Sequence, residues 1–64
     1  MRMPMYVTIE TARKIIETRR PCGVFWCRDG GVYIGIDNRT GDAWVEQFED
    51  FDKCMEWLEG EEDE

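Results

Sequence analysis

Apolar positions in the first third of the chain recur at helical spacing. One apolar stripe consists of Ile9, Ala12, Ile15 and Ile16, and charged side chains fill most of the positions between them. Thr8, just before the stripe, is a favourable N-cap residue, and Pro21 cannot continue a helix. The pattern therefore predicts a helix that begins after Thr8 and ends before Pro21.

The centre of the chain alternates between two kinds of side chain, which is typical of strands. Three strands are expected, at residues 23–28, 31–37 and 42–48. Asp29-Gly30 is a strong hairpin signal between the first two strands. We expect it to form a two-residue turn that places Trp26 opposite Tyr33.

The two faces of this expected meander differ in chemistry, because neighbouring side chains on a strand point in opposite directions. The aliphatic face, which is the expected core, carries Phe25, Cys27, Val32, Ile34, Ile36, Ala43 and Val45. The other face is aromatic mixed with charge, and a loop at 38–41, with positive φ at its final glycine, is expected to place Trp44 opposite Gly35. Two arrangements stay open. Either the second helix or a chain end covers the aromatic face as a second small core, or both helices pack on the aliphatic face and leave Trp26, Tyr33 and Trp44 exposed as a partner site.

A second helical pattern follows the strands, beginning near Asp52 and ending at Gly60. Its apolar side consists of Phe51, Cys54, Met55 and Leu58. The sequence thus predicts an α+β fold in the order helix, three-stranded antiparallel meander, helix, with the helices packed on the sheet. Residues 1–60 are expected to form a single compact domain, and the like-charged residues 61–64 a disordered acidic tail.

This order of elements resembles that of double-stranded-RNA-binding domains. The basic cluster that those domains carry at the start of their last helix is replaced here by Glu49, Asp50 and Asp52 with a single Lys53. RNA binding by that mode is therefore not expected.

Composition excludes several function classes. The 64 residues include no histidine and no serine, which removes Ser-His-Asp and Cys-His relays and imidazole metal sites. A chain of this size buries only about 60% of its unfolded surface and has no room for a deep substrate cleft. We expect a protein that is not an enzyme and that uses no cofactor.

Cysteine count and hydropathy bear on the chemistry and the location. Cys22, Cys27 and Cys54 are odd in number and lack a fourth soft ligand, so we expect reduced, hydrophobic cysteines and no metal site. No apolar run approaches the roughly 20 residues of a membrane helix, and the start lacks the apolar stretch of a signal peptide. A cytoplasmic location and no membrane partner are expected.

Charge is distributed unevenly along the chain. The formal charge is −7, which disfavours direct binding to nucleic acid. Residues 1–32 hold six basic and three acidic groups, whereas residues 33–64 hold two basic and twelve acidic groups. Such an acidic surface either improves solubility alone or presents carboxylates where the basic groove of a partner expects phosphates.

The function expected from these features is protein binding. The leading hypothesis is an inhibitor that occupies the basic groove of a nucleic-acid-binding protein by nucleic-acid mimicry, as phage and mobile-element inhibitors of the anti-CRISPR or anti-restriction type do. The alternative is a homodimer or assembly subunit that uses the aromatic sheet face. The candidate partner-binding residues are Trp26, Tyr33, Trp44, Asp42, Glu46, Glu49, Asp50, Asp52, Glu56 and Glu59.

Overall fold

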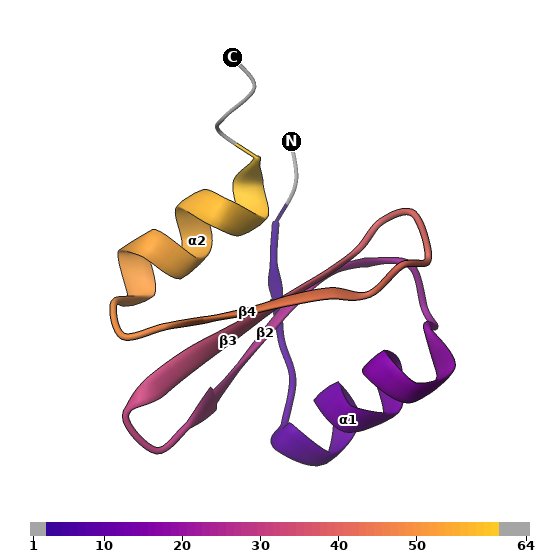
Figure 1. The fold of residues 1–64 in the computed structure, drawn as a ribbon, viewed down its shortest axis with the longest axis horizontal. Helices are drawn as coiled ribbons and strands as arrows, with labels where there is room; N and C mark the ends of the chain where they lie inside the picture. The colour runs from indigo at the N-terminus through magenta and orange to yellow at the C-terminus, as the bar shows by residue number, and fades with distance from the viewer. Residues whose placement is uncertain (1–2, 61–64) are drawn as a thin grey trace.

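In the part of the chain that the structure describes, two helices and a four-stranded mixed sheet make up the fold, which is α+β as predicted (Figure 1). The computed structural model describes residues 3–60, so the acidic tail predicted at 61–64 lies outside the described residues. The elements are β1 (Met5–Tyr6), α1 (Ile9–Thr18), β2 (Gly23–Asp29), β3 (Val32–Asn38), β4 (Trp44–Phe48) and α2 (Phe51–Glu59). The strands lie in the order β1-β2-β3-β4, with β1 parallel to β2 and the remaining pairs antiparallel.

Both helices begin at side-chain caps. The Thr8 side chain accepts a hydrogen bond from the Thr11 backbone N–H, which confirms the predicted start of α1. The second helix begins slightly earlier than predicted, because Asp50 rather than Asp52 is the N-cap residue and accepts from the Asp52 N–H. Gly60 ends α2 in the left-handed conformation, as predicted.

The prediction of three strands missed β1. Met5 and Tyr6 pair with Phe25 and Trp26, and the Val7 N–H donates to the Trp26 carbonyl at 2.9 Å. A strand of two residues is too short to show an alternation of apolar and polar side chains. β1 pairs with β2 only because α1 returns the chain to its side. The connection from β1 through α1 to β2 is the crossover that a parallel pair of strands requires.

The hairpin turn between β2 and β3 lies one residue later than predicted. Its loop is Gly30-Gly31, between the paired residues Asp29 and Val32. Gly30, with φ 65°, takes the first loop position, where a two-residue hairpin favours a positive φ. As a result Trp26 lies opposite Gly35 and not opposite Tyr33.

The expected pairing of β3 with β4 is also wrong, because Asn38 belongs to β3 and the loop is longer. The buried side-chain amide of Asn38 donates to the Pro21 carbonyl at 2.8 Å and accepts from the Ala43 N–H at 3.0 Å. Gly35 consequently lies opposite Glu46, and Trp44 lies opposite Asp37. Both registers move partners by two residues, so every side chain keeps its predicted face.

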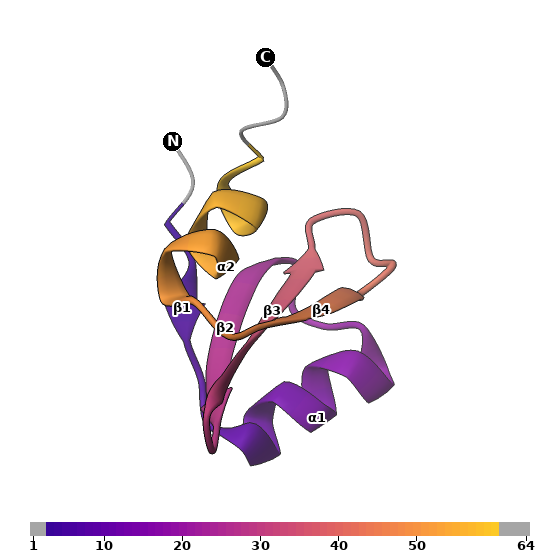
Figure 2. The same ribbon diagram turned by 60° about the vertical axis from the view of Figure 1, so that its left-hand side comes forward.

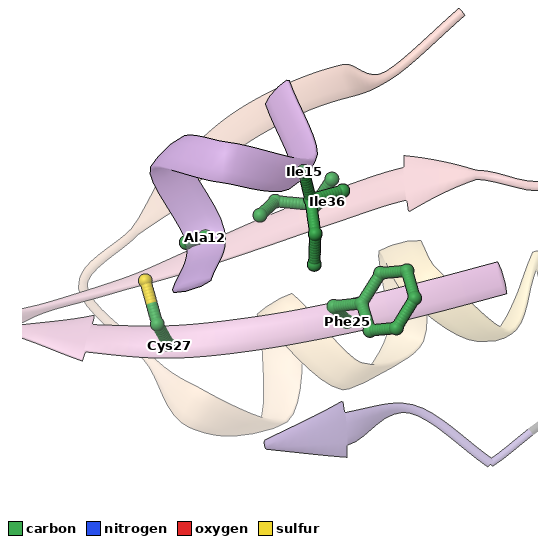
Figure 3. Close-up of a cluster of buried hydrophobic side chains, with 5 residues drawn as sticks. All are labelled: Ala12, Ile15, Phe25, Cys27 and Ile36. Atoms are coloured by element: carbon green, nitrogen blue, oxygen red, sulfur yellow. The ribbon is translucent and has the colours of Figure 1, made fainter. Parts of the chain in front are cut away.

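The helices cover opposite faces of the sheet (Figure 2). One hydrophobic cluster joins α1 to the aliphatic face and contains Ala12, Ile15, Phe25, Cys27 and Ile36 (Figure 3). A second cluster joins α2 to the aromatic face, and its buried members are Val24, Cys54 and Leu58, with Trp26, Tyr33, Phe48, Met55 and Trp57 packed against them. Of the two arrangements left open by the sequence, the structure has the one in which the second helix covers the aromatic face.

Candidate functional site

Two of the three predicted aromatic anchors are partly covered by other parts of the chain. Trp26 and Tyr33 are half-buried and contact Phe51 at the start of α2, with ring centroids 5.0 and 5.5 Å apart. Tyr6 of β1 packs edge-on against Trp26 at 4.9 Å. The arrangement in which both helices pack on the aliphatic face is therefore wrong. α2 follows β4 directly and packs on the aromatic face of the sheet.

Gly35 explains why α2 fits so closely on this face. A Cβ atom at Gly35 would lie 3.1 Å from the Trp57 ring and 3.3 Å from the Cys54 Sγ. Because Gly35 has no side chain, α2 can pack closely against β3 at this position. The glycine leaves room for the Trp57 ring. The sequence had instead indicated Trp44 as its neighbour.

Trp44 remains accessible and lies apart from the other rings. Its side chain is 63% exposed at the start of β4, beside Asp37 on β3. Ring contacts among residues 3–60 join Trp26, Tyr33 and their neighbours but do not include Trp44. Of the three predicted aromatic anchors, only Trp44 is mostly exposed.

The predicted carboxylates are all exposed and lie within one stretch of the chain. We call the exposed carboxylates of residues 42–59 the acidic surface, and its members are Asp42, Glu46, Glu49, Asp50, Asp52, Glu56 and Glu59. They lie on the loop before β4, on β4 itself and along α2. Lys53 is the single cation in this stretch of sequence, which carries a formal charge of −6.

Two of these carboxylates also have local structural roles. Asp50 caps α2, and Asp42 accepts a hydrogen bond from the Thr40 hydroxyl at 2.9 Å. Beside Trp44, Asp37 forms an ion pair with Arg39. These interactions stabilise the loop before β4 and the first turn of α2.

Basic side chains lie on both sides of the sheet, because Arg28 of β2 lies over the Tyr33 ring on the side that α2 covers. Arg13 and Lys14 are exposed on α1, and Arg19 and Arg20 follow its end. Since α1 and α2 lie on opposite faces of the sheet (Figure 2), the four cations on and after α1 are on a different helix layer from the carboxylates of α2.

Two of the three cysteines are buried thiols whose pKa is raised. Burial raises the pKa of the Cys54 thiol to about 11, with a further contribution from Cys27, and burial likewise raises the pKa of Cys27. Cys22 is exposed. Among residues 3–60 no group of three or more potential ligands is arranged to hold a metal ion. None of the helices in that range is long and apolar enough to cross a bilayer.

Comparison of the chain with protein-family models, with curated proteins and with solved structures found no match. The function must therefore be argued from the surface itself.

Two residues of the aromatic group escaped the sequence reasoning. Tyr6 and Phe51 complete the ring contacts around Trp26. The signal for Phe51 was present, since it lies on the apolar side of the second predicted helix. The position of Tyr6 depends on the pairing of β1 with β2, for which the sequence holds no pattern.

Proposed function

We propose that this chain is a small acidic inhibitor protein that occupies the basic groove of a nucleic-acid-binding partner. The acidic surface carries this proposal, because residues 42–59 hold seven exposed carboxylates and a single cation. Carboxylates spread over a surface present negative charge where such a groove ordinarily meets phosphates. Association would be steered by charge and weakened by salt.

Trp44 supplies the apolar contact for this binding mode. Tryptophan is enriched among residues that dominate binding energy, and the exposed indole adjoins the acidic surface at the start of β4. Trp26 and Tyr33 take no direct part in the proposal, because their rings pack against Phe51. Inhibitors of the anti-CRISPR and anti-restriction type are similar in size and charge, and that similarity is one of kind only.

The alternative is a homodimer built on the aromatic sheet face. That face packs against α2 of the same chain. We therefore do not propose it.

Affinity capture with matched charge variants tests the proposed function. The immobilised chain should retain a nucleic-acid-binding protein from host lysate, and raising the salt from low to molar concentration should release it. The double variant Glu46→Gln/Glu56→Gln removes two carboxylates of the acidic surface and should weaken capture at least tenfold.

The control removes the same charge from the other layer. Glu10→Gln/Glu17→Gln lowers the net negative charge equally but changes only exposed residues of α1. It should retain the partner as the unmodified chain does. Equal loss in both double variants, or capture that is indifferent to salt, would contradict the proposal.

A further inference from the structure

Backbone geometry shows which groups at the edge of the sheet lack a strand partner. The Val7 N–H donates to the Trp26 carbonyl, so the backbone groups of Trp26 point toward β1. These directions alternate along a strand, and Phe25 therefore points toward β3 and its partner Ile36. Ile36 in turn points its N–H and C=O back toward β2.

The same alternation carries across β3 to the edge strand. Gly35 points toward β4 and forms a hydrogen-bonded pair with Glu46. Val45 and Gln47, on either side of Glu46, must then point their N–H and C=O groups away from the sheet. Since β4 is the last strand of the described sheet, two donors and two acceptors line its outer edge.

The two edges of the sheet differ in how well they are protected. β1 has two residues and is preceded by Pro4, and short strands and prolines discourage pairing with another chain. β4 has five residues and contains neither proline nor lysine. Val45 and Trp44, on opposite faces of this strand, are 42% and 63% exposed. The β4 edge is therefore the one suited to accept another strand.

We propose that an extended, cationic segment of the protein partner pairs with the outer edge of β4. This inference rests on the proposed function and names the part of the partner that would enter the site. Charge selects the occupant, because residues 40–52 hold five carboxylates and no cation. A lysine or arginine on the added strand would lie beside Glu46, where opposite charges on neighbouring strands stabilise the pair.

A second copy of this chain is the less favourable occupant. Pairing Val45 of one copy with Gln47 of the other would place Glu46 opposite Glu46, and like charges directly opposite are destabilising. Any other register still brings together two acidic segments. The fitting segment instead alternates, with cations facing Glu46 and Trp44 and apolar side chains facing Val45.

A peptide titration of the full chain tests this assignment. The probe is a short capped peptide of alternating arginine and valine, followed by amide NMR and hydrogen exchange. The backbone N–H groups of Val45 and Gln47 should gain protection on binding, while those of Trp44 and Glu46, which already face β3, should change little. A peptide with glutamate in place of arginine should not bind.

Backbone pairing is separated from simple charge attraction by two further variants. N-methylation of every second peptide residue keeps the charge but removes the strand's hydrogen bonds, and should weaken binding at least tenfold. Gln47→Pro removes one outward donor without touching the ladder to β3, and proline is tolerated where an edge N–H faces solvent. It should weaken binding severalfold relative to the matched variant Gln47→Thr.

Several results would overturn the inference: equal binding of the N-methylated peptide, protection that maps to another element, or dimerisation of the chain through β4. Failure of the inference and failure of the function are distinguishable. If lysate capture depends on Glu46 and Glu56 but not on the proline at position 47, the acidic surface acts without strand pairing. If the peptide pairs with β4 but no nucleic-acid-binding protein is captured, the proposed function alone is wrong.

Discussion

The contact between Gly35 and α2 gives a direct test of the fold, through the substitution Gly35→Ala. The new Cβ would lie 3.1 Å from the Trp57 ring and 3.3 Å from the Cys54 Sγ. Both distances are shorter than ordinary van der Waals contact. Because Cys54 is fully buried and has little room to move, the Trp57 indole and α2 would have to shift. Overpacking of this kind costs about 1–3 kcal/mol.

Gly31→Ala is the matched control. A Cβ at Gly31 meets nothing within 4 Å, and its φ lies outside the left-handed region. Both variants share the loss of glycine's backbone freedom in the unfolded chain, so their difference isolates the contact with α2. For a domain of this size 1 kcal/mol shifts the melting temperature by roughly 4–8 °C. Gly35→Ala should therefore melt on the order of 5–20 °C below Gly31→Ala in circular dichroism.

A double-mutant cycle assigns the cost to the indole. Trp57→Leu removes the ring that the new methyl group meets, and Gly35→Ala should then cost about 1 kcal/mol less than in the unmodified chain. Equal melting temperatures for Gly35→Ala and Gly31→Ala would refute the reasoning. The same conclusion would follow if the cost of Gly35→Ala were unchanged by Trp57→Leu.

Three further predictions follow from the described contacts. Asn38→Ala removes the amide that bonds Pro21 and Ala43, and should lower the free energy of unfolding in urea by about 1–3 kcal/mol, whereas a change near zero would contradict its bridging role. Thr8→Ala removes the N-cap of α1 and should cost about 1 kcal/mol in the same assay, with Thr8→Ser recovering most of it and no loss arguing against the cap. Burial raises the pKa of the Cys54 thiol from 9.0 to about 11, so the folded chain keeps a proton that the unfolded chain releases. Stability should therefore fall between pH 9 and 11, and unfolding at stepped pH should show a shallower fall for Cys54→Ala; an identical slope would contradict the raised pKa.

Side-chain alternation predicted the chemistry of the sheet better than its register. The separation of Phe25 and Cys27 from Trp26 and Tyr33 depends only on a period of two, and both register errors were even, so the faces survived. The register depended on where each turn began. At Gly30-Gly31 two adjacent glycines made neighbouring turn positions nearly equivalent.

Tertiary contacts account for what the sequence could not settle. Asn38 spans the loop before β4 by accepting from the Ala43 N–H, and its amide also donates to the carbonyl of Pro21, far away along the chain. The choice of face for α2 was open because its apolar side fits either face of the sheet. Gly35 favours the aromatic face by leaving room for Trp57, a complementarity that is visible only once the two residues are brought together.

The candidate site was partly predictable for the same reasons. Acidic residues can be identified from the sequence alone, and all seven carboxylates predicted for the site are exposed. The aromatic anchors depended on the unassigned position of α2, and only Trp44 remains accessible. The open edge of β4 follows from the expected order of the strands, since the last strand of a meander has one neighbour.

Competition with nucleic acid tests the central proposal most directly. A complex of this chain with its captured partner would be titrated with the partner's own oligonucleotide, and the fraction of chain still bound would be followed by fluorescence anisotropy. If the acidic surface occupies the basic groove, the two ligands exclude each other and the apparent dissociation constant of the chain rises in proportion to free oligonucleotide. A ternary complex, with the chain retained at saturating oligonucleotide, would contradict the account.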